Sequence, residues 1–392
     1  MFIGIDASRA TGERLTGTEL YSREIIRHLV QAAPQHRFRL YTRVAATPGL
    51  FVGYASNAEV VHIQQPRLWT HVGLAREIAA RPPDALLIPA HVLPLPGAWH
   101  FRTATPIKTV VTVHDVGYRY FPSAHPLKQR LYLDLSTAFS ARFASQIIAV
   151  SQATQQDVMK FYHAPASKIT VAHEGIVPLP ETNAEDEEVT RIKFNLSTNQ
   201  PYFLHIGTLQ PRKNLRRLLI AFAAVRDSFQ SSQSPQSSQS LISNLQSPLL
   251  VLAGGAGWGA EDLPGLARSL GVAEQVRFAG YISDVEKAAL LRGAFAYVAP
   301  SLYEGFGLPV LEAQSVGTPV LCSNTSSLPE VAGDGALLFN PAHEQAIAAA
   351  LQCILLDANL RTRLINKGYE NVKRFSWHSC AMKILGVLEE GG

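Results

Sequence analysis

Short runs of apolar and β-branched residues alternate with amphipathic stretches along the first part of the chain. The clearest helical pattern spans 18–31, where Ile26 and Leu29 fall on one face. Continuous apolar strands separated by helices predict a parallel sheet that is covered on both faces. The runs that we predict to be strands are 2–7, 37–42, 59–63, 85–90, 108–113, 146–151 and 168–172.

The alternation pauses in the proline-containing, acidic segment 177–199, which predicts a linker with one short helix, and then restarts. The second series of predicted strands is 202–208, 249–255, 276–281, 294–300, 319–324 and 336–340. The pattern predicts an α/β protein with two doubly wound, Rossmann-like domains, at 1–176 and 200–374, joined by a linker and followed by an amphipathic helix within 375–392. Such folds bind ligands beyond the carboxyl ends of their strands, so we expect the active site in a cleft between the two domains.

Composition narrows the class of protein. Hydrophobic residues make up 47% of the 392 residues, and no apolar run approaches the roughly 18 residues that a membrane span needs. The start of the chain is too short and too quickly polar for a secretory signal. Three cysteines without a C-x-x-C pair argue against a disulfide framework or a zinc site. These features predict a cytoplasmic protein.

Positive charge is concentrated in the first part of the chain. Residues 1–176 contain 18 Lys and Arg against 11 Asp and Glu, whereas residues 200–392 contain 15 of each. Two interpretations stay open: ordinary surface variation, or attraction to a phosphate-bearing acceptor or to the anionic inner face of the plasma membrane. We expect no nucleic-acid partner. Residues 228–247 are almost all Ser and Gln and predict a mobile surface insertion without a catalytic role.

The segment GTLQPRKN (207–214) directly follows a predicted strand. Gly207 allows a tight turn, and Arg212 and Lys213 precede a helix expected to begin at about Asn214. Two cations at a helix entrance, which is itself partly positive, suit a diphosphate. The alternative is a pair of solvated surface cations.

The segment SLYEGFGLPVLEA (301–313) follows another predicted strand. Gly305 and Gly307 permit close approach of the backbone to a ligand, and Pro309 suits the start of a helix. Glu304 on the loop and Glu312 on the helix could accept hydrogen bonds from sugar and ribose hydroxyls. The alternative makes Glu304 a turn residue and Glu312 a partner of the helix dipole.

Together, EGFGLPVLE (E-x7-E) and the upstream strand–G-x4-R-K-N–helix resemble the retaining glycosyltransferases of family 4, which have the GT-B architecture. The resemblance covers nearly the whole chain and is most similar to mannosyltransferases. It implies that Arg212 and Lys213 bind the donor diphosphate, that Glu304 contacts the donor sugar and that Glu312 holds the ribose. The other donor-binding positions that it implies are Gly207, Gly254, Tyr281, Ile282 and the backbone N–H groups of Phe306, Gly307 and Leu308. Thr208 stands where many relatives have an arginine, a charge that Arg212 would supply.

The resemblance extends to the first half of the chain. It implies that 1–176 is the acceptor-binding domain and 200–374 the nucleotide-sugar-binding domain, and that the last helix, within 375–392, crosses back to the first domain. Gly17 matches the family's glycine-containing loop beside the donor phosphate, and His114 matches a histidine that contacts the transferred sugar. A structural hydrogen-bonded pair of His114 with Asp115 is the alternative. Glu174 in HEGI replaces an asparagine common in relatives. The stretch 118–133, where aromatic and basic residues interleave, is open to three interpretations: an acceptor flap, an interfacial membrane contact, or a loop that leads into a surface helix.

The expected reaction is transfer of a hexose, mannose as the first choice, with retention at the anomeric carbon. The donor would be GDP-mannose or a UDP-hexose, and the acceptor a glycan or lipid-linked molecule of cell-surface polysaccharide assembly. No Asp-x-Asp occurs, so we expect neither a metal nor another cofactor. Two alternatives belong to other classes: an NAD-dependent Rossmann protein, although neither domain opens with a strand-linked G-x-G-x-x-G, and a nucleotide-sugar-binding module without transfer.

Overall fold

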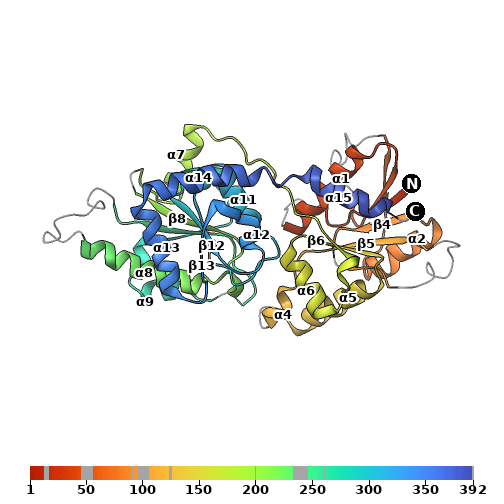
Figure 1. Ribbon diagram of the computed structural model, residues 1–392, viewed down its shortest axis with the longest axis horizontal. Coiled ribbons are helices and arrows are strands. Elements are labelled where there is room, and N and C mark those ends of the chain that lie inside the picture. The colour runs from red at the N-terminus through yellow and green to blue at the C-terminus, as the bar shows by residue number, and fades with distance from the viewer. Residues whose placement is uncertain are drawn as a thin grey trace. The chain divides into compact units, whose positions relative to one another are not determined.

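The computed structural model divides the chain into two compact units. Unit 1 comprises Met1–Arg119, Leu127–Gly175 and Phe375–Gly392, and unit 2 comprises Tyr120–Pro126 and Ile176–Arg374. The described residues are 1–12, 17–45, 56–90, 92–95, 106–122, 126–198, 200–232, 246–259 and 261–390. Each unit is a parallel sheet with helices packed against it (Figure 1).

Unit 1 contains a seven-stranded sheet in the order β3-β2-β1-β4-β5-β6-β7. All of the pairings between these strands are parallel. The chain moves outward from β1 in one direction and then restarts beside β1 in the other, so the strand order reverses between β1 and β4. The strands are Phe2–Asp6 (β1), Arg37–Thr42 (β2), Ala58–His62 (β3), Ala85–Ile88 (β4), Lys108–Val113 (β5), Gln146–Ala149 (β6) and Ile169–Val171 (β7).

Helices cover the sheet of unit 1 because its central strands are buried along nearly their whole length, as expected for a sheet covered on both faces. The α1 residues Ile25 and Leu29 are fully buried, while Trp69 and Leu74 pack with Tyr41 in a separate cluster. The helices are Gly17–Ala32 (α1), Ala75–Ala80 (α2), Gly117–Tyr120 (α4), Leu127–Phe143 (α5), Gln152–Tyr162 (α6) and Trp377–Glu389 (α15), with a π-helix at Trp69–Leu74 (η1) and a 3-10 turn at Ala166–Lys168 (η3).

Helix α15 comes from the far end of the chain but folds as part of unit 1, where it packs on α1 and β5. Trp377 is 3% exposed, and its ring meets Tyr21 edge to face with centroids 5.7 Å apart. Gly175 packs against Trp377, and a Cβ on Gly175 would lie 2.1 Å from the backbone nitrogen of Trp377. Only glycine therefore fits at Gly175.

Unit 2 contains a six-stranded parallel sheet in the order β10-β9-β8-β11-β12-β13, which again reverses beside its first strand. Leu250 and Leu252 face one hydrophobic cluster, and Leu249 and Val251 face the other, as expected for a sheet buried on both sides. The strands are Tyr202–Ile206 (β8), Leu249–Ala253 (β9), Val276–Gly280 (β10), Ala296–Ala299 (β11), Val320–Ser323 (β12) and Ala336–Phe339 (β13).

Helices α8, α9 and α13 contribute to one cluster, and α10, α11 and α12 to the other. The helices of unit 2 are Ala184–Lys193 (α7), Leu215–Ser232 (α8), Leu263–Ser269 (α9), Asp284–Gly293 (α10), Leu308–Ser315 (α11), Leu328–Ala332 (α12), Glu344–Leu356 (α13) and Ala358–Val372 (α14), with 3-10 turns at Pro211–Lys213 (η4), Ala273–Gln275 (η5) and Gly333–Gly335 (η6).

The predicted strands are all present, although most end one or two residues earlier than the apolar runs suggested. The segment 177–199, which was predicted to be a linker, differs more from the prediction. Its residues fold with unit 2, where α7 packs against α10 and where Phe194 and Leu196 join a hydrophobic cluster. The short helix expected within this segment is α7, which the capping box of Asn183 and Asp186 starts. Most of the Ser/Gln insertion 228–247 lies outside the described residues, and α8 extends to Ser232.

Candidate functional site: a carboxylate and two cations at the carboxyl edge of the sheet in unit 2

Arg212 and Lys213 lie in a turn just beyond β8. Gly207, the first residue after the strand, has a φ of +153°, a value that suits glycine. The cations occupy the 3-10 turn η4, and Asn214 follows in a left-handed conformation. The Asn214 amide donates to the carbonyl oxygens of Pro300 (3.0 Å) and Pro341 (2.8 Å). The helix expected from about Asn214 begins at Leu215 as α8, and the cations precede it in a separate turn that Asn214 ends.

Glu304 accepts hydrogen bonds from both cations. Its carboxylate lies 2.5 Å from the Lys213 ammonium and 2.6 Å from the Arg212 guanidinium, and the Ser301 hydroxyl donates to it at 2.6 Å. Glu304 and Lys213 are both buried. Burial raises the pKa of Glu304, but Arg212 and Lys213 outweigh it and hold that pKa well below its usual range. The interpretation of Glu304 as a simple turn residue is excluded, since its side chain organises a buried ion cluster.

Two serines hold the loop that carries Glu304. The backbone N–H of Glu304 donates to the Ser326 hydroxyl at 3.0 Å. The Ser327 hydroxyl donates to the carbonyl oxygens of Glu304 (2.9 Å) and Phe306 (2.6 Å). Gly307, with a φ of +119°, then starts α11 at Leu308. The first N–H groups of a helix lack partners within it, so this turn can present donors to an anion.

Glu312 lies in α11 and accepts a hydrogen bond from the Lys287 ammonium of α10 at 2.7 Å. Burial lowers the pKa of Lys287, but Glu312 outweighs it and raises that pKa. A partner from another helix was not predicted, because Lys287 lies far from both motifs in sequence. The interpretation of Glu312 as a partner of the helix dipole alone is incomplete.

The glycine turns after β8 and β9 touch each other. Gly254 has a φ of +140°, and a Cβ there would lie 2.0 Å from the carbonyl oxygen of Gly207. The Gly254 N–H donates to the Gly280 carbonyl at 2.7 Å, which ties these turns to the end of β10. Beyond β10, Tyr281 is 72% exposed and Ile282 packs against a hydrophobic cluster.

His205 of β8 is a residue that sequence analysis did not single out. It is fully buried, and its Nδ1 lies 2.9 Å from the carbonyl oxygen of Val298. Burial and then Lys213 lower its pKa to about 4, so the ring is neutral at pH 7. Its Nε2 has no hydrogen-bond partner among the described residues. A histidine in an apolar strand resembles core packing in sequence, which is why its place beneath Lys213 was missed.

His114 and Gly17 belong to unit 1. His114 follows β5 and is buried, with Nε2 3.0 Å from the Pro89 carbonyl oxygen and Nδ1 3.5 Å from Glu174. The alternative of a His114–Asp115 hydrogen-bonded pair is wrong, because both ring nitrogens face other acceptors, while the Asp115 carboxylate accepts from the Gly117 N–H at 2.8 Å. Gly17 is the exposed first residue of α1, and the loop residues 13–16 before it lie outside the described residues.

The structure thus brings together one set of the predicted residues in unit 2: the cations, Glu304, the touching glycines and the start of α11. They sit where β8 and β11 end, at the point where the strand order of this sheet reverses. In doubly wound sheets, ligands bind at this switch point, with phosphates on helix N-termini and charged side chains.

The comparison with known families agrees with this geometry. Residues 186–371 match the family described as "Glycosyl transferases group 1", and residues 15–178 match "Glycosyltransferase Family 4". The O-antigen chain mannosyltransferase B of Escherichia coli is 32% identical over 284 residues, which are 72% of this chain and 70% of that protein. The chain belongs to the glycosyltransferases of family 4, and the resemblance recognised in its motifs is confirmed.

A second relative is the O-antigen chain mannosyltransferase RfbU of Salmonella typhimurium, 27% identical over 62% of this chain and 60% of its own length. Among solved structures, sucrose-phosphate synthase from Thermosynechococcus elongatus superposes with a TM-score of 0.70 at 20% identity, covering 98% of both chains. Anabaena HepE in complex with UDP-glucose gives 0.68 at 20% identity, covering 99% of this chain and 98% of its own. These likenesses show the GT-B fold.

Proposed function

We propose that this glycosyltransferase moves a hexose, with mannose as first choice, from a nucleotide sugar to a glycan or lipid-linked acceptor of cell-surface polysaccharide assembly. The ion cluster of Arg212, Lys213 and Glu304 carries the proposal. Two cations and one carboxylate leave one net positive charge at the switch point, which attracts a dianionic diphosphate. The relatives named as O-antigen mannosyltransferases support mannose, and a neighbour that contains UDP-glucose supports a nucleotide-sugar donor.

In the proposed reaction, the bond between the anomeric carbon and the diphosphate oxygen breaks, and a bond to an acceptor hydroxyl forms on the same face. The acceptor proton passes to the departing diphosphate. Arg212 and Lys213 stabilise the negative charge that develops on this leaving group. Glu304, kept ionised by its cations, accepts hydrogen bonds from sugar hydroxyls and faces a donor carbon that becomes positively charged.

We propose that this chemistry needs neither a metal nor another cofactor, since the two cations supply the charge that a divalent ion would supply. Full activity after dialysis against EDTA would agree with the proposal. Recovery of activity only on adding Mg²⁺ or Mn²⁺ would reject it.

We further propose a cytoplasmic site of action with peripheral contact to anionic membrane through α5. Leu127, Leu131 and Leu135 are exposed and recur every four residues, with Lys128 and Arg130 between them. Such a face suits the headgroup region of a bilayer. None of the helices within the described ranges is both long and apolar enough to cross a membrane. Co-sedimentation with vesicles containing phosphatidylglycerol, but not with phosphatidylcholine alone, is the expected result.

A donor screen without acceptor tests the central proposal. Purified protein is incubated with GDP-mannose, UDP-glucose, UDP-galactose and NAD, and nucleotide release and thermal stabilisation are recorded. We expect slow hydrolysis and an increased melting temperature with GDP-mannose. Stabilisation by NAD alone, or no response to any nucleotide sugar, would overturn the proposal. Proton NMR of a transfer product then reports whether the anomeric configuration is retained.

A further inference from the structure

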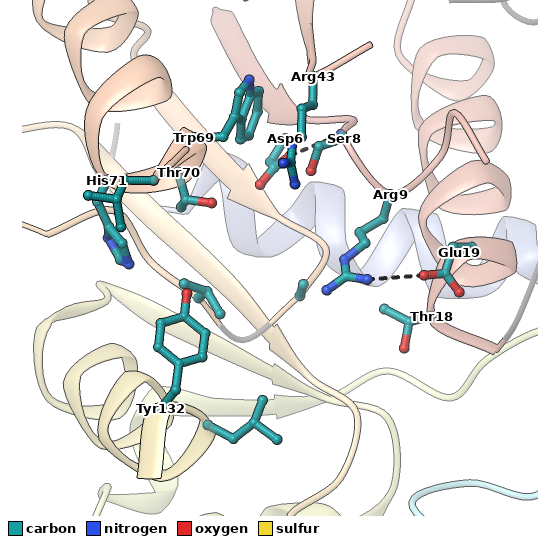
Figure 2. Close-up of a pocket in the computed structure, with 14 residues that line it drawn as sticks. Asp6, Ser8, Arg9, Thr18, Glu19, Arg43, Trp69, Thr70, His71 and Tyr132 are labelled. Atoms are coloured by element: carbon teal, nitrogen blue, oxygen red, sulfur yellow. Dashed lines mark hydrogen bonds and ion pairs between the residues drawn. The ribbon is translucent and has the colours of Figure 1, made fainter. Parts of the chain in front are cut away.

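A buried side-chain nitrogen beside the ion cluster of unit 2 has no partner within the described part of the chain. This atom is Nε2 of His205, whose ring is fully buried. Buried acceptors in proteins usually have a donor. The carboxylate of Asp6 in unit 1 shows the usual case, since it accepts from the backbone N–H of Ser8 at 3.0 Å (Figure 2). An exception to this rule next to charged site residues indicates a partner that the chain itself does not supply.

The other ring nitrogen of His205 determines what Nε2 can do. Strand β8 pairs with β11 through Phe203 and Leu204. At the next position the ring of His205 reaches β11, with Nδ1 2.9 Å from the carbonyl oxygen of Val298. A carbonyl oxygen only accepts, so Nδ1 carries the proton. Burial and then Lys213 lower the pKa of His205 to about 4, so the ring holds only this proton at pH 7. Nε2 is therefore an acceptor.

Gly207 keeps open the space that Nε2 faces. A Cβ on Gly207 would lie 3.6 Å from Nε2 of His205 and 3.3 Å from both Cε and Nζ of Lys213. The ammonium and Nε2 thus border the same small space, although they form no direct hydrogen bond with each other. A water molecule can accept from an ammonium and donate to a ring nitrogen, which joins two polar groups that lie beyond direct hydrogen-bonding distance.

Lys213 needs more than one acceptor to hold the direction of its ammonium. This group carries three donors that rotate at the end of a flexible four-carbon stem. Glu304 accepts from it at 2.5 Å but also reduces the positive charge offered to a diphosphate. A second carboxylate would cancel the charge of Arg212 and Lys213 entirely. A neutral imidazole fixes the ammonium and leaves the charge of the cluster unchanged.

We propose that His205 is a positioning residue for Lys213: its Nε2 accepts a hydrogen bond from a water molecule beside Gly207, and this water accepts one from the Lys213 ammonium. The water bridge and Glu304 together direct the ammonium toward the diphosphate oxygen that leaves the anomeric carbon. His205 touches neither the donor nor the acceptor and acts only through Lys213. The inference rests on the proposed function and adds to it a residue outside the sequence motifs.

Two amide substitutions separate the functions of the two ring nitrogens. In His205→Gln the amide lies where Nε2 lies and can still accept from the water. In His205→Asn the shorter side chain places its amide where Nδ1 lies, so it can still donate to Val298. We expect kcat to fall about tenfold in His205→Asn and less than about twofold in His205→Gln, as is typical for a lost hydrogen bond that involves a charged group, with a smaller change in KM for GDP-mannose. The reverse order, or equal kcat in the two variants, would assign His205 to packing and overturn the inference.

Tyr202→Phe is the matched control for the loss of a buried hydrogen bond in the same strand. Tyr202 lies at the other end of β8, and its buried hydroxyl donates to the carbonyl oxygen of Leu290 at 2.7 Å. Thermal melts set a temperature at which all of the variants are folded, and kcat is compared there. Tyr202→Phe should keep kcat within about twofold of the wild-type value. A loss of kcat as large as that in His205→Asn would overturn the inference, because any weakening of β8 would then suffice.

Nitrogen NMR of protein labelled at its histidine rings reports the bridge without a change at His205. The His205 signals are assigned by their absence in His205→Gln. Lys213→Met removes the donor to the bridging water, so the Nε2 signal of His205 should shift. Lys193→Met, which breaks an exposed ion pair with Glu286, should leave that signal in place. An unchanged Nε2 signal in Lys213→Met would overturn the inference.

Binding of inorganic pyrophosphate separates this inference from the proposed function, because it involves no sugar transfer. Calorimetry should show binding to the wild type, affinity about threefold lower in His205→Asn and nearly unchanged affinity in His205→Gln. This pattern in a protein that uses no nucleotide sugar would refute the proposed function and support the positioning of Lys213. Normal transfer and normal pyrophosphate binding in His205→Asn would overturn the inference and leave the proposed function intact. A wild-type protein that binds no pyrophosphate would overturn the inference as well.

Discussion

His114 and Glu174 form a buried pair, with Nδ1 of the ring 3.5 Å from Oε1 of the carboxylate. The other ring nitrogen lies 3.0 Å from the carbonyl oxygen of Pro89. Both nitrogens face acceptors, so the ring satisfies both contacts only when it carries two protons. Burial lowers the pKa of His114, but Glu174 outweighs it and raises that pKa above its ordinary value. Glu174, which replaces the asparagine of many relatives, thus favours an imidazolium.

Replacing Glu174 by Gln should lower the pKa of His114, because the partner charge is lost while burial remains. An NMR titration of the histidine ring protons measures this shift. The pair stabilises the fold below the ordinary histidine pKa, and its contribution is lost as pH rises through the raised folded pKa. Glu24→Gln, which removes a carboxylate 3.7 Å from His28 on α1, is the control and should leave the His114 titration unchanged. An unshifted titration in Glu174→Gln would contradict this account.

Replacing Lys213 by Met should reduce transfer by at least ~10²-fold, because a donor that stabilises the leaving diphosphate is removed. Glu304→Gln should reduce transfer similarly but keep more stability than Glu304→Ala, because its amide oxygen can still accept from Lys213. Glu304→Ala removes both the charge and the acceptor, at a typical cost of about 3–5 kcal/mol. Initial rates and thermal melts measure both effects. Lys193→Met, which breaks an exposed ion pair with Glu286, is the control and should change neither by much. Near-normal turnover in Lys213→Met would refute the assigned role.

Replacing Gly254 by Ala should abolish donor binding and destabilise unit 2 by more than about 2 kcal/mol, because the new Cβ would collide with the Gly207 carbonyl in a strained backbone conformation. The neighbouring Gly255→Ala is the matched control, since its Cβ would meet nothing within 4 Å. Urea unfolding and nucleotide-induced melting shifts distinguish the two. Equal stability of the variants would show that the glycine turns can move apart.

Lowering the pH from 7 to 5 should destabilise the protein in part through His205. Its folded pKa is about 4, against an ordinary value of 6.5, so between these values the unfolded chain binds a proton that the folded chain does not. Stability falls by about 1.4 kcal/mol for each pH unit below 6.5, or about 2 kcal/mol at pH 5. Urea unfolding of wild type and His205→Gln at both values tests this. The same loss between pH 7 and 5 in both proteins would exclude His205 as the source.

The alternation of apolar runs and amphipathic stretches was sufficient to predict both sheets. Strand ends were less predictable, because residues such as Ala7 continue the apolar run after the last paired residue of the strand. Arg212, Lys213 and Glu304 were recognisable because each motif directly follows a strand. Their ion cluster was not predictable, since it joins residues 91 and 92 positions apart.

The side-chain partners that other helices and strands supply to the predicted site residues were not identified from the sequence. The pairing of Lys287 with Glu312 and of Glu174 with His114 depends on tertiary packing, which periodicity does not encode. The π-helix η1 has no local sequence signal comparable to a capping box, so it was not predicted.

The place of α15 in unit 1 has a consequence for synthesis on the ribosome. Unit 2 is almost continuous in the chain and can fold as soon as Arg374 has emerged. Unit 1 emerges first but keeps the α1 and β5 surfaces uncovered until α15 follows. Tyr21 is fully buried in the finished fold. After Gly175 has been translated, about 200 further residues must follow before α15 can cover it. The first unit to leave the ribosome is the last to be completed, and in that interval it is the natural substrate for chaperones.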